Sequence, residues 1–175
     1  MQTQGPVAFA LPSGWSAASE GRLIVVRPPE DGSRLVIVEV GAAASADAAA
    51  TAAWNLADPA FKRAVEVSAV SNPKNGWDQR QSIAYKSTPE ERRTVRSVAA
   101  RAGGKWVVFL LDSSDQAYDR RRAGYGQIFD SLRPKDYVPE SFAGRTAAIL
   151  DAAKIANLRR FLEQSGERLR IPGIG

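Results

Sequence analysis

Ser71 and Lys74 have the spacing S-x-x-K, in which a lysine amine can take the proton of a nucleophilic serine hydroxyl. That chemistry requires both side chains on one turn of a helix. Pro73 lies between them and Asn75-Gly76 follows, which is typical of a turn. Tyr85-Lys86-Ser87 matches a Y-x-S pattern only loosely. We therefore interpret this segment as a loop. A small esterase that uses Ser71 and Lys74 stays an alternative, which Ser71→Ala would test by loss of esterase activity.

Residue types that are absent narrow the chemistry further. The sequence contains no cysteine and no histidine, so this chain alone can build no Ser-His-Asp triad, thiolate nucleophile or Cys/His zinc site. The carboxylate pairs Glu30-Asp31 and Glu90-Glu91 lie beside proline or glycine, which favours solvated loops. Gly103-Gly104 and the pair Gly124 and Gly126 do not extend to a phosphate-binding loop. We predict no catalytic residue, no cofactor and no metal ligand in this chain.

The net charge of +5 raises the question of a nucleic-acid partner. The dense basic spots are Arg92-Arg93, Arg120-Arg121-Arg122 and Arg159-Arg160, and each has acidic residues nearby. This arrangement indicates solvated faces rather than a track for phosphates. We expect no nucleic-acid partner, although a binder whose affinity falls steeply with salt is an alternative. Four tryptophans spread along the chain are expected in the core: Trp15, Trp54, Trp77 and Trp106.

Short β-branched runs separated by turn sequences predict a sheet. The expected strands cover residues 6–10, 22–27, 34–40, 65–70, 77–85, 92–101 and 105–112. The break from Pro28 to Gly32 predicts one hairpin, and Gly103-Gly104 predicts another between the last two strands. The fold class is therefore predicted as α+β, with an antiparallel sheet of about six or seven strands covered by two helices. A linker and a C-terminal amphipathic helix are expected to follow.

The two covering helices have recognisable starts. Ser45 begins an alanine-rich helix that extends to about Leu56 and is expected to lie close on the sheet. Ser113/Ser114 begins a second helix that ends near Leu132. Gly124 and Gly126 each weaken that helix by about 1 kcal/mol relative to alanine. Tight packing against the sheet would explain both glycines.

The sequence predicts three regions: an α+β accessory domain over 1–132, a linker over 133–150, and an amphipathic helix with the start of a missing catalytic domain over 151–175. The apolar side of the last region is predicted to be an interdomain contact. Its candidate residues are Ile155, Leu158, Phe161, Leu162 and Ile171. No stretch approaches the roughly 20 apolar residues of a membrane-spanning helix, so no membrane span is expected.

Residues 140–175 resemble a known junction. The relevant segments are Glu140 to Arg145, Leu150-Asp151 with the helix that follows, and Ile171-Pro172-Gly173. They resemble the entry into the catalytic domain of β-lactamase-like, penicillin-binding-protein-related serine hydrolases, where a Val/Ile-Pro-Gly leads into the first catalytic strand. The catalytic motifs of that family lie downstream of this point, so no catalytic residue carries over. The resemblance implies a non-catalytic N-terminal domain of an exported bacterial esterase or peptidase.

Residues 6–132 resemble the PsbP-like group of α+β domains. The shared features are the F-x-L-P-x-G-W segment from Phe9 to Trp15, the W-V-V at Trp106, and the helix that ends in Ser131-Leu132-Arg133-Pro134. This resemblance implies an alternative function, a stand-alone binding or assembly module of the cell envelope. The expected partner is the downstream catalytic domain or another protein. The expected location is periplasmic or secreted, with the signal peptide removed, and a cytoplasmic location is the alternative. The oligomeric state stays open.

Overall fold

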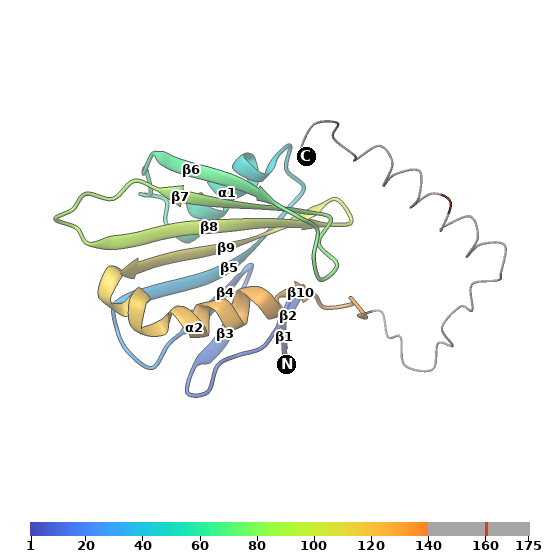
Figure 1. The fold of residues 1–175 in the computed structure, drawn as a ribbon, viewed down its shortest axis with the longest axis horizontal. Helices are drawn as coiled ribbons and strands as arrows, with labels where there is room; N and C mark the ends of the chain where they lie inside the picture. Colours follow the sequence, from blue (N-terminus) through green and yellow to red (C-terminus); the bar gives the residue numbers. More distant parts are fainter. Residues whose placement is uncertain (140–159, 161–175) are drawn as a thin grey trace, which may run out of the picture. The chain divides into compact units, whose positions relative to one another are not determined.

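The computed structural model describes residues 1–139 and residue 160. A seven-stranded antiparallel sheet has the order β3-β4-β5-β9-β8-β7-β6 (Figure 1). This arrangement confirms the predicted α+β fold class and its antiparallel sheet. The strands are β3 (Ser16–Glu20), β4 (Leu23–Arg27), β5 (Ser33–Gly41), β6 (Val65–Ser71), β7 (Gln79–Tyr85), β8 (Arg93–Ala102) and β9 (Lys105–Ser114).

The middle of the sheet is built on β9. Its residues from Trp106 to Leu111 are all buried, because apolar side chains on both faces of this strand are covered. β8 and β9 form the predicted hairpin, in which Ala102 pairs with Lys105. Gly103 and Gly104 both have positive φ, 56° and 75°, as a two-residue turn of this hand requires. The predicted hairpin of β4 and β5 is also confirmed.

The helix α1 (Ala46–Ala57) covers one face of the sheet. Ser45 caps it by accepting a hydrogen bond from the backbone N–H of Ala48 at 3.1 Å. The alanines that face the sheet are buried: Ala46, Ala49, Ala50 and Ala53. Because these side chains are small, the helix lies close to β5, β8 and β9, as the sequence predicted.

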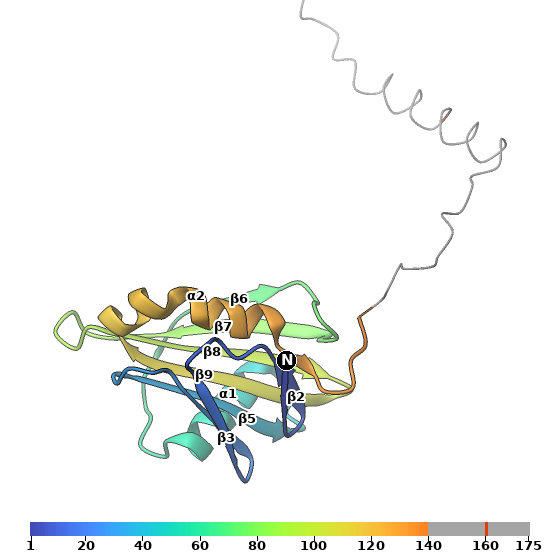
Figure 2. The same ribbon diagram turned by 90° about the horizontal axis from the view of Figure 1, so that it is seen from below.

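The helix α2 (Asp115–Ser131) covers the opposite face (Figure 2). The alternation within β5 shows this division. Leu35 and Ile37 pack in the same core as Tyr125 of α2, whereas Val36 and Val38 pack in the core under α1. Ser114 caps α2 by accepting a hydrogen bond from the N–H of Ala117. Both helices therefore begin where their cap residues predicted.

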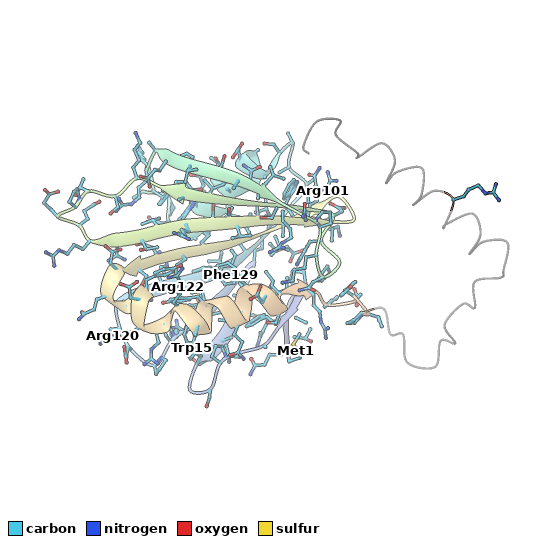
Figure 3. All side chains as sticks on the ribbon, in the orientation of Figure 1. Met1, Trp15, Arg101, Arg120, Arg122 and Phe129 are labelled. Atoms are coloured by element: carbon cyan, nitrogen blue, oxygen red, sulfur yellow. The ribbon has the colours of Figure 1, made fainter. Side chains whose placement is uncertain are left out.

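The two glycines of α2 have different surroundings. A Cβ atom at Gly124 would lie 2.7 Å from Cζ2 of Trp15, which lies beside α2 (Figure 3). Tight packing therefore explains this glycine, although its neighbour is a tryptophan and not the seven-stranded sheet. At Gly126 nothing lies within 4 Å of such an atom. The expectation of tight packing was wrong for Gly126.

A small second sheet joins the two ends of residues 1–139. It has the order β1-β2-β10, with β1 (Gln2–Gln4), β2 (Val7–Phe9) and β10 (Arg133–Pro134). The sequence placed Arg133 and Pro134 at the start of a linker, and in the structure they pair with Ala8 and Val7. The indole N–H of Trp77 donates to the carbonyl of Leu132 at 2.9 Å, which ties the end of α2 to the sheet.

Residues 1–139 form one compact unit. Within the residues that the structure describes, neither helix has the length and apolar character needed to cross a membrane. The predicted region boundaries at 132/133 and 150/151 stay predictions. The five candidate interdomain residues, Ile155, Leu158, Phe161, Leu162 and Ile171, lie outside the described residues.

Candidate functional site

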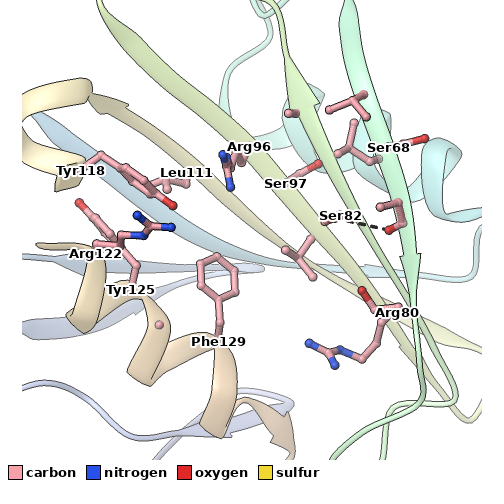
Figure 4. A pocket seen from close by; sticks show the side chains of 17 residues that line it. Ser68, Arg80, Ser82, Arg96, Ser97, Leu111, Tyr118, Arg122, Tyr125 and Phe129 are labelled. Atoms are coloured by element: carbon pink, nitrogen blue, oxygen red, sulfur yellow. Dashed lines mark hydrogen bonds between the residues drawn. The ribbon is translucent and has the colours of Figure 1, made fainter.

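The helix α2 leaves one end of its face of the sheet uncovered. Its hydrophobic core includes residues of β4, β5, β8 and β9, but among the described residues none from β6 or β7. A groove of about 460 Å³ lies there, between α2 and strands β6 to β8 (Figure 4). We call it the α2 groove. Its lining residues are Val67, Ser68, Ala69, Ser71, Arg80, Ser82, Ile83, Ala84, Arg96, Ser97, Val98, Leu111, Tyr118, Arg122, Tyr125, Gly126 and Phe129.

The sequence of β7 explains why this face stays open. Ile83 and Tyr85 are buried in the core under α1. The intervening Ser82 and Ala84 lie on the opposite face, since side chains alternate along a strand, and they are too small to hold a helix. Across the strand pair, Ser82 is opposite Ala69 of β6 and Ala84 is opposite Val67. The floor of the groove is therefore made of small side chains.

Three arginines from three different elements line the α2 groove. Arg80 belongs to β7, Arg96 to β8 and Arg122 to α2. Arg96 and Arg122 lie at the end marked by Tyr118, and Arg80 lies at the other end beyond Phe129 (Figure 4). The guanidinium carbon of Arg96 is 5.6 Å from the ring centroid of Tyr118, which is a cation–π distance.

These arginines differ from others on the same protein. Arg63, Arg93 and Arg101 each form an ion pair with a carboxylate at 2.9 Å or less. Within the part of the chain that the structure describes, neither Arg80 nor Arg122 forms an ion pair, and the same holds for Arg96. No Asp or Glu is among the lining residues. The α2 groove therefore carries positive charge that is available to an anion.

Aromatic rings form the wall of the groove on the α2 side. Tyr118 stacks on Tyr125 with ring centroids 5.6 Å apart, and Phe129 packs on Phe109 at 4.2 Å. The Tyr125 hydroxyl donates to Ser33 at 2.6 Å, so this polar group is already bonded. The wall is therefore apolar and fixed by packing. A groove of this size that combines apolar walls with a few charged groups is typical of a binding site.

A second hollow, of about 310 Å³, lies on the α1 side beside Trp54 and Tyr85. Here Arg63 is paired, because it donates two hydrogen bonds to Glu91, at 2.9 and 3.1 Å. The Arg63 guanidinium and the Thr88 backbone N–H hold the Glu91 pKa at about 2. Burial raises the pKa of Tyr85. The pKa of Glu91 and the pKa of Tyr85 are both shifted further from neutral pH, so these two groups do not suit acid–base catalysis.

The serine and lysine of the S-x-x-K spacing do not share a helical turn. Ser71 ends β6 and lines the α2 groove, whereas Lys74 lies in the following loop, where its backbone pairs with Trp77. The Lys74 ammonium instead forms an ion pair with Asp130 at 3.1 Å. The predicted loop is confirmed, and the geometry that an esterase would need is not present at these two residues.

The structure also locates the other residues that the sequence singled out. All four tryptophans are buried, as predicted. Glu30 pairs with Arg120 and Arg121 on an exposed surface. No group of three or more acidic side chains that could hold a metal ion occurs among residues 1–139 and 160.

The sequence analysis missed the α2 groove itself. Arg96 lies in β8 between Val95 and Ser97, and it is directly opposite Ala84 in β7. An arginine on the same face as small residues was the available signal. Arg122 was treated only as part of a solvated cluster, because the sequence does not show which strand α2 passes.

Comparisons with known proteins support the fold. No protein-family model and no curated sequence matches the chain. The solution structure of the cyanobacterial PsbP (CyanoP) of Synechocystis sp. PCC 6803 is similar with a TM-score of 0.55 and 13% identity, over 74% of this chain and 86% of that one. LpqN of Mycobacterium tuberculosis, described as involved in cell envelope biogenesis, reaches a TM-score of 0.45 and 14% identity over 73% and 82%. The fold of CyanoP is thus shared by this chain, as the PsbP-like resemblance of residues 6–132 predicted.

Proposed function

We propose that residues 1–139 are a non-catalytic binding module and that the α2 groove is its working surface. The observation that carries this proposal is the combination in one groove of apolar walls and three arginines without carboxylate partners. Arginines without carboxylate partners contribute little to the stability of the fold. In a groove with apolar walls, their positive charge would attract and orient an anionic ligand. The loop position of Lys74, away from any helical turn with Ser71, supports a non-catalytic role.

The binding can be tested in the source cells with a photoreactive phenylalanine analogue. Ser82 is exposed in the α2 groove, and Ala48 is exposed on α1, so they make a matched pair of positions. We expect a discrete cross-linked product from position 82 that is absent from position 48. Equal yields at the two positions, or no product at either, would contradict the proposal.

The module belongs, in our proposal, to an exported protein of the cell envelope. The finer proposal is that it is the N-terminal accessory domain of a β-lactamase-like serine hydrolase and packs on or regulates the catalytic domain. The support is the sequence of residues 140–175, with its Leu150-Asp151 and Ile171-Pro172-Gly173 segments. A stand-alone PsbP-like assembly module is the alternative, and it is supported by the shared fold.

The intact mass of the native polypeptide, captured from its source cells, separates these two proposals. The 175 residues have a mass of 18.9 kDa. A substantially larger mass, with a helical S-x-x-K in the additional sequence, is the expected result for the hydrolase. A mass near that of the 175 residues would leave the stand-alone module.

A further inference from the structure

The strand β6 ends the seven-stranded sheet, and no other strand among residues 1–139 pairs with its outer edge. It spans seven residues, all of them exposed, and carries Val65, Val67 and Val70 with relative exposures of 50%, 59% and 82%. Natural edge strands are usually shielded by lysine, proline, a bulge or a covering element. β6 contains neither lysine nor proline; its one charged residue, Glu66, and its register shift both lie at its start, between Val65 and Val67. The stretch from Val67 to Ser71 is thus a regular strand, one side of which is free of any strand within residues 1–139.

The backbone of β6 can accept a further strand. The carbonyl of Ala69 accepts a hydrogen bond from the Ser82 hydroxyl at 3.4 Å, so it faces β7. Backbone groups of neighbouring residues in an antiparallel strand point to opposite sides. The N–H and C=O groups of Ser68 and Val70 therefore face the free edge. An extended chain could pair with them by main-chain hydrogen bonds.

The free edge and the arginines belong to one surface. Val67, Ala69 and Ser71 line the α2 groove from β6, and the groove continues across β7 and β8 to Arg96 and Arg122 (Figure 4). Arg80 lies toward the opposite end. Positive groups are thus placed at both ends of a strand-lined groove, with the ring of Phe129 between them.

We propose that the α2 groove takes an extended, acidic segment of a partner protein, which adds to the sheet beside β6. Carboxylates of that segment pair with Arg96 and Arg122 at one end and with Arg80 at the other, and an apolar side chain packs on Phe129. The inference rests on the proposed function, because it names the ligand class of the same groove. Charge complementarity identifies the partner as acidic, and the unpaired backbone of β6 identifies it as an extended polypeptide.

A synthetic heptapeptide, Thr-Glu-Thr-Phe-Thr-Glu-Thr with blocked ends and a fluorescent label, is a suitable probe. Its two carboxylates and its ring fall on one face, with the carboxylates about 13 Å apart when extended. Fluorescence anisotropy with the 175-residue chain measures binding. We expect at least about tenfold weaker binding for the Arg96→Gln, Arg122→Gln double variant, because charge-assisted hydrogen bonds are lost. Arg120→Gln, on the same helix but paired with Glu30, is the matched control.

The backbone contribution is tested by Ser68→Pro, which removes one outward N–H, against Ser68→Ala, which keeps it. We expect Ser68→Pro to weaken peptide binding at least several-fold more than Ser68→Ala does, with circular dichroism confirming that both variants are folded. A peptide with lysine in place of glutamate should not bind. Failure of the acidic peptide to bind would overturn the inference.

Two other results would also overturn it, each because it identifies a different occupant of the groove. Vesicles of phosphatidylglycerol or a single-stranded oligonucleotide that displace the peptide, with affinity unchanged by Ser68→Pro, would identify a lipid or a nucleic acid. Concentration-dependent dimerisation that Ser68→Pro abolishes would identify a second copy of this chain. A cross-link from position 82 without binding of the acidic peptide would refute the proposed ligand class but not the proposed function. Absence of that cross-link would refute the proposed function itself.

Discussion

The two faces of the seven-stranded sheet are covered in different ways, and β7 shows the contrast best. On the α1 side, Tyr85 lies under Trp54 and Phe61, whose rings stack at 3.8 Å. On the α2 side, Ser82 and Ala84 of the same strand form the floor of an open groove. One strand therefore contributes to the core on one face and to an open groove on the other.

This difference follows from the side chains that each helix presents. The alanines of α1 let it lie close to the sheet, and the aromatic side chains at its C-terminal end extend cover towards β7. The helix α2 is held by large residues, Tyr125 and Ile128, that pack in one core with residues of β4, β5, β8 and β9. Among the described residues, none from β7 or β6 belongs to this core, so α2 does not cover these two strands. One helix cannot cover a sheet of seven strands. The part of the α2 face that is left open lies over β6 to β8, and Arg80 and Arg96 lie there.

Trp54→Ala should have the largest effect on stability. It removes a buried indole that contacts both Phe61 and Tyr85, and we expect a loss of about 3–5 kcal/mol. Phe129→Ala, on the groove side, removes a half-buried ring and should cost only about 1–2 kcal/mol. Urea unfolding followed by circular dichroism measures both. Equal losses would mean that the two faces are equally well packed, contrary to the comparison.

The two glycines of α2 should respond in opposite directions to alanine. Gly124→Ala places a Cβ against the buried Trp15 ring and should destabilise the protein by about 1–3 kcal/mol. Gly126→Ala meets open space beside the groove and should stabilise it by about 0.5–1 kcal/mol, since alanine favours the helix. Thermal unfolding of the two variants is the measurement. A loss in both would show that the groove side of α2 is packed as tightly as the Trp15 side.

Features specified by local sequence were predictable. Ser45 and Gly103-Gly104 each act within a few residues, so the start of α1 and the β8–β9 turn agree with prediction. The strand β3 was missed because Ser16–Glu20 consists of serine, alanine and glutamate, without an apolar alternation. It is a strand only because β4 pairs with it. β10 likewise depends on β2, which is distant in sequence.

The α2 groove could not be predicted because it depends on the order of strands. Arg80 and Arg96 come from neighbouring strands, but Arg122 joins them only because α2 returns over β8 and β9. The sequence pattern predicted most strands of the large sheet but not their order, and the expected strand at residues 6–10 belongs to the small sheet as β2. The periodicity of β7, with Ile83 and Tyr85 alternating with Ser82 and Ala84, indicated a strand with one open face and could have directed attention there.

Glu91→Gln tests the paired charges of the α1 side through pH. The pKa of Glu91 is lowered from 4.5 to about 2, so the ionised form is favoured by folding. Its contribution to stability is therefore complete above pH 4.5 and is lost as the pH falls towards 2. We expect a small loss of stability in Glu91→Gln at pH 6 that shrinks between pH 4.5 and 2. Urea midpoints at several pH values measure it, with Glu90→Gln as the neighbouring control. A difference that does not change with pH would contradict the ion pair with Arg63.

The smallest effect on stability is expected for the Arg96→Gln, Arg122→Gln double variant. Apart from the cation–π contact of Arg96 with Tyr118, these guanidiniums have no ionic partner among the described residues. Removing two neighbouring positive charges also relieves repulsion. Unfolding free energy should therefore stay within about 0.5 kcal/mol of the parent.

Arg93→Gln, on the same strand as Arg96, is the contrast. It breaks a half-buried pair with Asp112 at 2.7 Å and should cost about 0.5–1 kcal/mol. If the double variant lost as much as Arg93→Gln, the groove arginines would have a structural role. A stable double variant that no longer binds the acidic peptide would instead separate folding from binding, as the contrast between the two faces of β7 predicts.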